Sequence, residues 1–436
     1  MNALLTDLYE LTMAAGYFET GKCQEKAAFE LTVRRLPPNR NFLLAAGLPQ
    51  VVDYLLNLRF TEEEISYLRG LPQFRLVSPA FFDYLRNFRF TGDLFAVPEG
   101  TPMFPGEPFL TIRAPLIEAQ IPETFALAAI GFQTMIATKA ARMSEAAAGR
   151  AVVEFGTRRA HSPDAGVLAG RAAYIGGCTG TSNTLAGFRY GIPVMGTAAH
   201  SWVMAFCEES KAFEKLQQVL GPATIQLVDT YDTIEGTRKA ARLGRPLRAI
   251  RIDSGDFSSL ARSARDILDE AGLDDVEIML TGDLDECRIA QLVASGTPVD
   301  SFGVGTQLAT SGDAPNLSAI YKMVELDISG IKRFTAKYSD DKATLPGAKQ
   351  VFRFPDCDVL GRAGECNQGQ PLLRPVILGG AMVEPLPNLD EVRAHARRSL
   401  AALPESLRGL RPSEPWAVEQ SKELAALADQ TRRNAR

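Results

Sequence analysis

The spacing of apolar residues predicts a mixed α/β region in the first third of the chain. Apolar residues recur at helical spacing over residues 4–18 and over the Ala-rich stretch 122–149, so we expect a helix in each. Residues 25–115 mix short β-like runs with helical ones. Within them, residues 94–112 alternate apolar residues with Pro and Gly, which favours antiparallel β-structure. These patterns predict an N-terminal α/β domain.

A regular succession of strands and helices follows. Most apolar runs here lead into Gly or polar residues and then into a helical pattern, and the runs are centred near Val153, Val194, Leu227, Ile250, Met279 and Phe302. The later runs are about 23 to 33 residues apart, which is the length of one βα unit. Such units form either a closed barrel or an open parallel sheet. Because polar residues follow nearly every run, we predict an irregular (β/α) barrel.

The regular pattern ends after residue 320. The pattern predicts β-hairpins over residues 321–355, with turns at Ser339-Asp340-Asp341 and Pro346-Gly347, further β-structure over 361–385, and helices from 388 onward. The predicted organisation is an N-terminal α/β domain (1–125), a barrel domain (126–330) and a C-terminal helical segment (386–436). We expect residues 335–385 to rejoin the first domain.

Composition narrows the class of protein. A chain of 436 residues with 46% apolar residues is long enough for two or three domains with large cores. Its formal net charge of -5 provides no basic surface for nucleic acid, and no run of ~18 apolar residues predicts a membrane span. Asp7 and Glu10 interrupt the apolar residues near the start, so we expect no signal peptide. Six cysteines without a CxxC pair are typical of reduced thiols in a cytoplasmic protein.

The most informative polar turn is the segment Arg251–Asp256, which follows a short apolar run and precedes an amphipathic helical pattern. It would place Asp253, Ser254 and backbone N–H groups at the C-terminal end of a parallel strand, where α/β folds bind ligands. Arg251 lies inside the apolar run and needs a partner there. We interpret that partner as an anionic ligand.

Two further turns suggest anion binding. Gly305 and Thr306 follow the last apolar run, and their N–H groups could cradle a phosphate, although a tight strand-to-helix turn explains the same residues. Arg158 and Arg159 follow another run, and a guanidinium binds carboxylate or phosphate with two hydrogen bonds. We expect one of these arginines to be structural and paired with an internal acid.

Three other turns carry candidate residues with competing interpretations. His200 follows Thr197 among small residues and is either a nucleophile, a general base or a satisfied core residue. Asn183 follows a run of hydroxyl-bearing residues and is either a ligand contact or a helix cap. Gly282 would let a sugar phosphate approach closely, and Asp283 next to it would bind ligand or cap a helix. Together the turns fit a phosphorylated sugar and a second anionic substrate.

Taken in their order along the chain, these motifs resemble those of the nicotinate phosphoribosyltransferase family. The resemblance covers nearly the whole chain and is carried by residues 4–13 (LLTDLYELTM), 154–160, 196–201, 251–256, 303–306 and 345–349. It implies an α/β barrel beside an N-terminal α/β domain. It also implies transfer of a phosphoribosyl group from phosphoribosyl pyrophosphate to nicotinate for NAD salvage, coupled to ATP hydrolysis through a phosphohistidine. Family members are usually homodimers with shared sites.

The resemblance also implies roles for single residues. His200 matches the phosphorylated histidine, Thr197 and Arg251 match positions that contact nicotinate, and Gly305 with Thr306 matches the loop for the 5′-phosphate. Tyr9 matches a tyrosine that stacks on the ring, donated by the other subunit.

Other members of the predicted site come from the chemistry that the reaction needs. Asp253 is expected to stabilise the ribosyl cation or bind Mg²⁺ with pyrophosphate. Arg158 is expected to hold pyrophosphate or the nicotinate carboxylate, and Arg159, Ser254, Gly282 and Asp283 complete the substrate contacts. Mg²⁺ is the expected cofactor and ATP the co-substrate.

Alternative functions remain open from the sequence alone. Nicotinamide phosphoribosyltransferase is similar in fold, but it uses an acidic residue where this chain has the uncharged Asn183, which favours the acid substrate. A barrel lyase or aldolase would need a lysine or a metal cluster at a strand end, and neither is found. A non-catalytic phosphoribosyl pyrophosphate-binding protein is the third alternative. We assign no role to three lysines, although basic residues at their positions could reach a nucleotide. They are Lys322, Lys342 and Lys349.

Overall fold

A computed structural model describes residues 2–339 and 342–435, and these residues form two compact units. Unit 1 comprises Met1–Met135, Asn316–Leu407 and Pro412–Arg436, and unit 2 comprises Ile136–Pro315 and Arg408–Arg411. The long helix α6 (Glu123–Ala146) contains the boundary between the units, about ten residues after the boundary expected from the sequence. Unit 2 is therefore inserted into the sequence of unit 1.

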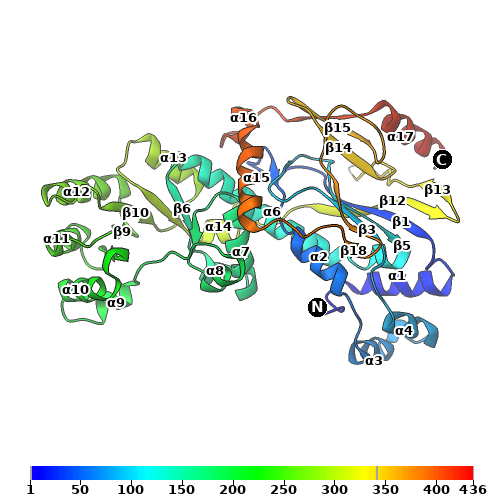
Figure 1. Cartoon of the computed structure of the whole chain (residues 1–436), viewed down its shortest axis with the longest axis horizontal. Helices are drawn as coiled ribbons and strands as arrows, with labels where there is room; N and C mark the ends of the chain where they lie inside the picture. Colours follow the sequence, from blue (N-terminus) through cyan, green and yellow to red (C-terminus); the bar gives the residue numbers. More distant parts are fainter. Residues whose placement is uncertain (1, 340–341, 436) are drawn as a thin grey trace. The chain divides into compact units, whose positions relative to one another are not determined.

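The described residues of unit 1 contain a seven-stranded sheet in the order β13-β12-β1-β5-β3-β17-β18 (Figure 1). Its strands are β1 (Lys26–Val33), β3 (Asp93–Ala96), β5 (Pro108–Pro115), β12 (Ala319–Ile328), β13 (Ile331–Phe334), β17 (Arg374–Leu378) and β18 (Ala381–Met382), and neighbours run antiparallel. β1 is buried along nearly its whole length because β5 and β12 cover both its edges. Segments from both ends of the chain thus share one sheet.

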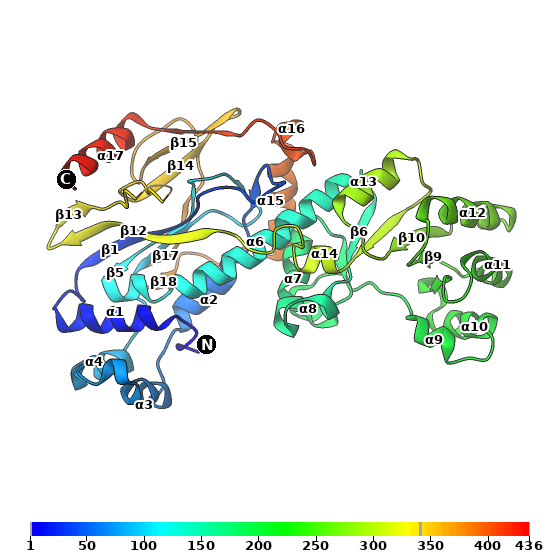
Figure 2. The ribbon, with the colours of Figure 1, turned by 180° about the vertical axis from the view of Figure 1, so that it is seen from behind.

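Smaller sheets and helices complete unit 1. A second sheet has the order β16-β14-β15-β19, and Leu43–Leu44 (β2) pairs with Pro102–Met103 (β4). The second sheet contains β14 (Lys349–Arg353), β15 (Cys357–Arg362), β16 (Gln370–Pro371) and β19 (Ala417–Gln420). The helices besides α6 are α1 (Leu8–Glu19), α2 (Leu48–Asn57), α3 (Glu62–Gly70), α4 (Pro79–Arg86), α5 (Leu116–Gln120), α15 (Leu389–Ala401), α16 (Glu405–Arg408) and α17 (Lys422–Asn434). Figure 2 shows α1 and α6 from the opposite side.

Unit 2 is built on a parallel sheet in the order β7-β6-β11-β10-β9-β8. Its strands are β6 (Ala151–Glu154), β7 (Gly180–Thr181), β8 (Ile225–Leu227), β9 (Ala249–Ile252), β10 (Glu277–Thr281) and β11 (Ser301–Val304). Val194 extends the sheet by a parallel bridge to Thr181. The predicted α/β fold with a barrel-type parallel sheet is confirmed, but within the described residues no pairing joins Val194 to β8, so the barrel is open there.

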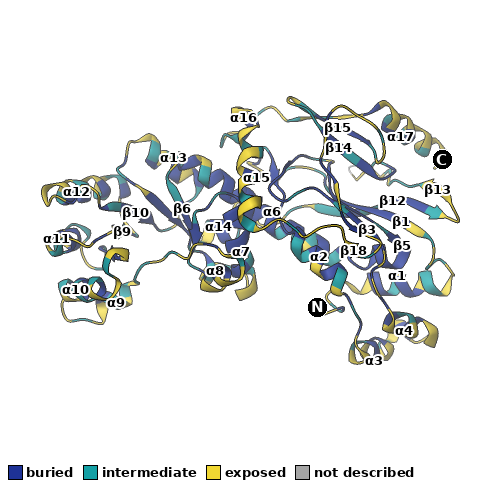
Figure 3. Cartoon of the chain, in the orientation of Figure 1, coloured by how far each residue is buried: buried dark blue, intermediate teal, exposed yellow. Residues whose placement is uncertain are grey.

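Eight helices of the described residues accompany the parallel sheet. They are α7 (Pro163–Ile175), α8 (Thr184–Tyr190), α9 (His200–Met204), α10 (Glu209–Leu220), α11 (Thr233–Leu243), α12 (Phe257–Glu270), α13 (Glu286–Ala294) and α14 (Thr306–Ala309). In α12, Phe257, Ala261, Ala264 and Leu268 are buried at helical spacing and the opposite face is exposed (Figure 3). In the described part of the chain, no helix combines the length and apolar character needed to cross a bilayer.

Several predicted details of the C-terminal part were wrong. The hairpin β12–β13 turns at Ser329-Gly330, where both residues have positive φ and where the sequence predicted no turn. Asp340-Asp341 of the predicted turn at 339–341 lie outside the described residues, but the N–H of Lys342 donates to Ser339 O (3.1 Å), which agrees with that prediction. Pro346-Gly347 leads into β14 and is not a hairpin turn. The segment expected to be wholly helical contains β19, which joins the second sheet beside β15. An exposed edge strand of four residues carries no apolar alternation that could reveal it.

Candidate active site

A polar cavity of about 360 Å³ lies in unit 2 where the parallel strands end. Its lining residues come from the ends of β6, β7, β9, β10 and β11, the turns that follow them, and the segment before α9. They are Phe155, Arg158, Arg159, Ser182, Gly196, Thr197, Ala198, Ala199, Arg251, Asp253, Thr281, Gly282, Asp283, Gly303, Gly305 and Thr306. This position is where parallel α/β folds hold ligands. The cavity contains nine of the thirteen residues predicted from the sequence.

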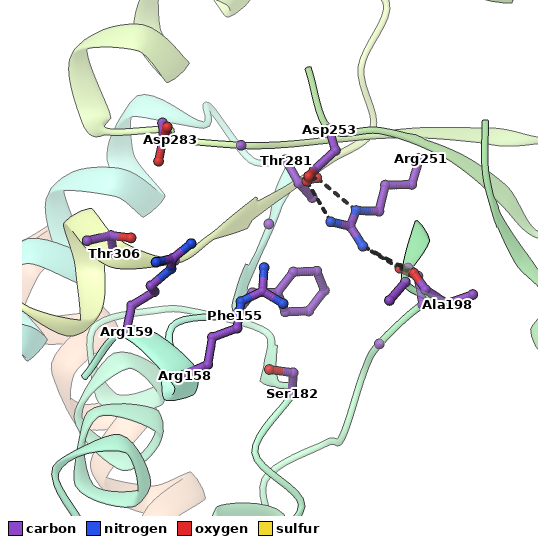
Figure 4. Close-up of a pocket in the computed structure, with 16 residues that line it drawn as sticks. Phe155, Arg158, Arg159, Ser182, Ala198, Arg251, Asp253, Thr281, Asp283 and Thr306 are labelled. Carbon is purple, nitrogen blue, oxygen red and sulfur yellow. Dashed lines mark hydrogen bonds and ion pairs between the residues drawn. The ribbon is translucent and has the colours of Figure 1, made fainter. Parts of the chain in front are cut away.

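Arg251 organises one wall of the cavity. Its Nε donates to Thr281 Oγ1 (2.8 Å), its Nη1 to Thr197 Oγ1 (2.7 Å), and its Nη2 to Asp253 Oδ1 (2.5 Å) (Figure 4). The sequence predicted a ligand anion as the partner of this charge, but the internal partner is Asp253. The guanidinium is therefore fixed in place by the protein before any ligand binds.

Asp253 is held as a carboxylate. Burial opposes its ionisation, but the hydrogen bond that Thr281 Oγ1 donates and the charge of Arg251 outweigh burial and lower its pKa below the ordinary value. Both interactions engage Oδ1, whereas Oδ2 faces His200 Nε2 at 3.8 Å. One carboxylate oxygen thus remains for a cationic partner.

His200 begins α9, beside the cavity, and its side chain is 38% exposed. Its Nδ1 lies 3.2 Å from the hydroxyl Oγ1 of Thr230, which leaves Nε2 directed toward Asp253. If Nδ1–H donates a hydrogen bond to Thr230 Oγ1, Nε2 carries the free lone pair. The interpretation of His200 as a core residue is thereby excluded.

Asp229 supports this wall from the end of β8 and was missed as a site residue. Its Oδ2 accepts from the backbone N–H of Asp253 (3.0 Å) and from Ser254 Oγ (2.9 Å). Ser254 therefore points at Asp229 and is not among the residues that line the cavity. The signal for Asp229 was its place directly after an apolar run.

Arg158 and Arg159 form the opposite wall. Figure 4 shows both side chains extending into the cavity from the short 3₁₀ turn Thr157–Arg159. Buried Glu154 holds this turn through the Gly156 N–H, and it also accepts from Thr181 Oγ1 (2.6 Å). The expectation that one arginine pairs with an internal acid was wrong, since neither has a hydrogen bond or ion pair with the described part of the chain. Both charges are available to an anion.

The glycines at the strand ends allow the backbones to come close. A Cβ on Gly282 would lie 2.0 Å from the carbonyl oxygen of Asp253, and Gly282 has φ of +98°. Asp283 follows at φ 46° and lines the cavity with an exposed side chain. Gly305 and Thr306 lie across from it at the start of α14, with Gly305 as the cap residue. Phe155, which the sequence interpretation overlooked, adds an aromatic wall directly after β6.

Asn183 and Tyr9 lie outside this cavity. Asn183 is buried, its Oδ1 caps α8 by accepting from Ala186 N (2.9 Å), and its Nδ2 donates to Thr157 Oγ1 (3.0 Å). Its amide is therefore engaged within the protein. Tyr9 belongs to α1 in unit 1, where the residue is 43% exposed. Burial, then the charges of Glu123 and Glu10, raise the pKa of its hydroxyl.

The residues present fit a divalent cation that arrives with phosphate groups. Among the described residues no group of three or more His, Cys, Asp or Glu side chains could hold a metal ion. Mg²⁺ is usually bound by one or two carboxylates together with substrate phosphates. Asp253, whose Oδ2 has only His200 Nε2 nearby at 3.8 Å, and Asp283 provide such carboxylates on the cavity wall.

Three models of the nicotinate phosphoribosyltransferase (NAPRTase) family match successive parts of the chain. The N-terminal domain model matches residues 4–131, the family model matches residues 151–342, and the C-terminal domain model matches residues 363–428. The chain belongs to the nicotinate phosphoribosyltransferase family.

Nicotinate phosphoribosyltransferases of bacteria and mammals resemble the chain along most of its length. "Nicotinate phosphoribosyltransferase pncB2" of Mycobacterium tuberculosis is 48% identical over 422 residues, which are 94% of this chain and 89% of that protein. The Bacillus subtilis nicotinate phosphoribosyltransferase is 43% identical over 360 residues, 80% of this chain and 73% of that protein. The crystal structure of human nicotinic acid phosphoribosyltransferase superposes with a TM-score of 0.83 at 30% identity, covering 98% of this chain and all (100%) of that one.

Proposed function

We propose that the chain transfers the phosphoribosyl group of phosphoribosyl pyrophosphate to nicotinate, giving nicotinate mononucleotide and pyrophosphate for NAD salvage. The observation that carries this function is the cavity itself, in which an ionised Asp253 faces two arginines that have no partner in the described part of the chain. The family membership and the similar relatives support the same reaction.

Displacement at C1′ of the ribose builds positive charge on the sugar. A carboxylate fixed by Arg251 and Thr281 stabilises that charge without having to reorganise. Nicotinate supplies its ring nitrogen as the nucleophile, and its carboxylate needs a cation. Arg251, already oriented by Thr197, is the cation beside Asp253.

The anionic ends of the sugar substrate match the remaining walls. The backbone at Gly305 and Thr306 accommodates the 5′-phosphate, and Gly282 lets the ribose approach the Asp253 backbone. Arg158 and Arg159 hold the pyrophosphate. Asp253 Oδ2 and Asp283 would hold Mg²⁺, which neutralises charge on the pyrophosphate when bound.

ATP coupling through His200 is part of the proposal. With Nδ1 bound to Thr230, Nε2 is the nitrogen that attacks the γ-phosphorus, the bond to the bridging oxygen breaks, and ADP leaves. The phosphate adds nearly two negative charges close to Asp253, and hydrolysis by water later restores the imidazole. We propose that this change of charge reorganises the segments that hold pyrophosphate.

Exposed apolar side chains support a homodimer with shared sites. On α1 and the turn before it, Leu5, Leu8, Tyr9 and Met13 are 38–59% exposed at helical spacing. In unit 2, Phe188 is 87% and Val194 52% exposed. We propose that a second copy covers such surfaces and that its Tyr9 reaches the nicotinate ring, in a cytoplasmic enzyme.

The first test is product formation from the purified protein with Mg²⁺ and phosphoribosyl pyrophosphate, comparing nicotinate with nicotinamide, each with and without ATP. Mononucleotide from nicotinate only, with ADP released in step, would support the proposal. Product from nicotinamide would instead indicate the sister activity. Substrate binding without product would favour a non-catalytic binding protein.

The role of His200 is tested by His200→Ala, with His161→Ala as the control in an exposed turn outside the cavity. We expect His200→Ala to lose stimulation by ATP and ³²P labelling from γ-labelled ATP, and His161→Ala to retain both. Full ATP-stimulated turnover in His200→Ala would remove the phosphohistidine from the mechanism.

A further inference from the structure

Two cavities of unit 1 adjoin at a basic cluster, which we define as Arg374, His395 and Arg398. Their volumes are about 370 and 440 Å³, and all three residues of the cluster line both. No residue of either cavity lines the cavity of unit 2. The established family and the proposed reaction assign nothing to this place.

The cluster is assembled by two elements. Arg374 begins β17, and His395 and Arg398 lie three residues apart on α15, which places them on the same face of that helix. Neither arginine makes a hydrogen bond or ion pair with the described residues. Burial, followed by the charges of Arg398 and Arg374, lowers the pKa of His395. Among the described residues the cluster therefore contains two arginines without an ion pair, although Glu99, Glu384 and Glu391 line the smaller cavity beside them.

His395 is oriented toward this charge by Thr101. The Thr101 hydroxyl donates its one hydrogen to Pro98 O (2.7 Å), so it accepts at 3.1 Å from Nε2–H of His395. Ser399 Oγ lies 3.4 Å from the same nitrogen. Nδ1 keeps its lone pair and has no partner in the described part of the chain. Protonation at Nδ1 would therefore add a donor to the cluster.

The larger cavity has the lining of a site for a planar anion. None of the described residues that line it is Asp or Glu, and Arg353, its third arginine, is neutralised by the buried Asp358 (Nη2 to Oδ2, 2.6 Å). Phe354, Leu372 and Trp416 are among its apolar walls. Trp416 Nε1 is buried and has no acceptor among the described residues.

We propose that the basic cluster and the larger cavity bind a nucleotide, with its phosphates on Arg374 and Arg398 and its base against the wall that contains Trp416. A guanidinium pair selects phosphate oxygens through paired hydrogen bonds. Aromatic side chains favour a planar base, and the volume suits a ligand of nucleotide size. Inorganic phosphate would satisfy the arginines but leave the apolar wall empty.

Intrinsic fluorescence can isolate the site because the chain has two tryptophans, Trp202 in unit 2 and Trp416. In a Trp202→Phe background, ADP should change the fluorescence of Trp416 saturably. Adenosine should bind at least tenfold more weakly, because it lacks the phosphates, and inorganic pyrophosphate should displace ADP.

The decisive comparison is Arg374→Ala/Arg398→Ala against Arg397→Ala, an exposed neighbour on α15 that lines neither cavity. We expect the double variant to bind ADP at least tenfold more weakly and Arg397→Ala to stay within twofold. Any ADP bound in the cavity of unit 2 is common to both variants, so equilibrium dialysis with labelled ADP should show one site fewer in the double variant. Equal affinity and stoichiometry in the two variants, or adenosine binding as tightly as ADP, would overturn the proposal.

Discussion

Thr281→Val tests the polar network of the cavity with little change of shape. Thr281 is 2% exposed, and its hydroxyl donates to Asp253 while it accepts from Arg251 at 2.8 Å. Hydrogen bonds to charged groups contribute roughly 1.5–3 kcal/mol each. Arg251 keeps its contacts with Asp253 and Thr197, so we expect a loss of about 1.5–3 kcal/mol in total. That corresponds to a fall in kcat/KM of roughly 10- to 150-fold.

The pH profile separates this effect from a general loss of structure. Thr281 is the largest of the influences that lower the pKa of Asp253, so valine should raise that pKa. The acid limb of kcat/KM should then move to higher pH, since the reaction needs the carboxylate. The assay is initial rate of nicotinate mononucleotide formation against pH, with urea unfolding in parallel.

Two variants serve as controls for Thr281→Val. Thr281→Ser keeps the hydroxyl and should restore most of the rate and the acid limb. Thr237→Val removes a buried hydroxyl of α11 that bonds only the carbonyl of Thr233, and should change stability without moving the pH profile. If folded Thr281→Val kept the wild-type rate and acid limb, the network would not set the charge of Asp253.

Three further outcomes are expected. Burial raises the pKa of Glu10 to about 7, so the folded state holds a proton that the unfolded state loses near pH 4.5. The free energy of unfolding should therefore fall as the pH rises from 4.5 to about 7. Urea titrations should show that Glu10→Gln removes this pH dependence. Gly282→Ala should lower kcat/KM more than 100-fold, because the new Cβ would collide with the carbonyl oxygen of Asp253. The control Gly244→Ala has a similarly strained φ of +65° but open space around its Cβ, so it should lose only about 1 kcal/mol of stability and keep the wild-type kcat/KM. Arg159→Ala should raise the KM for phosphoribosyl pyrophosphate at least tenfold with less effect on the KM for nicotinate; equal increases would place the arginine elsewhere.

Much of the site could be predicted because polar residues directly after apolar strands are a local signal. In a parallel sheet, strand ends converge whatever the order of the strands, so Arg251, Asp253 and Thr306 could be grouped without knowing the topology. The prediction that Arg251 needs a partner was sound, but the sequence could not choose between a ligand and a residue two positions away.

What could not be predicted depends on contacts between distant segments. Thr281 reads in the sequence as the last residue of a strand, and its role appears only when β9 lies beside β10. Asn183 has the same local sequence whether it caps a helix or meets a ligand, and only the distances to Ala186 and Thr157 show the cap. β7 has two residues, which is too short for any periodicity.

The pairing of β1 with β12 has a consequence for synthesis on the ribosome. Val33 at the end of β1 pairs with Ala319 at the start of β12, and all of unit 2 except Arg408–Arg411 is translated between them. At ~5–20 residues per second, β12 follows β1 by roughly 15–60 s. Throughout that interval the nascent chain presents one open, apolar strand edge while an entire parallel sheet emerges behind it. Chaperone contacts during translation should therefore concentrate on the first 135 residues and be released once β12 leaves the exit tunnel.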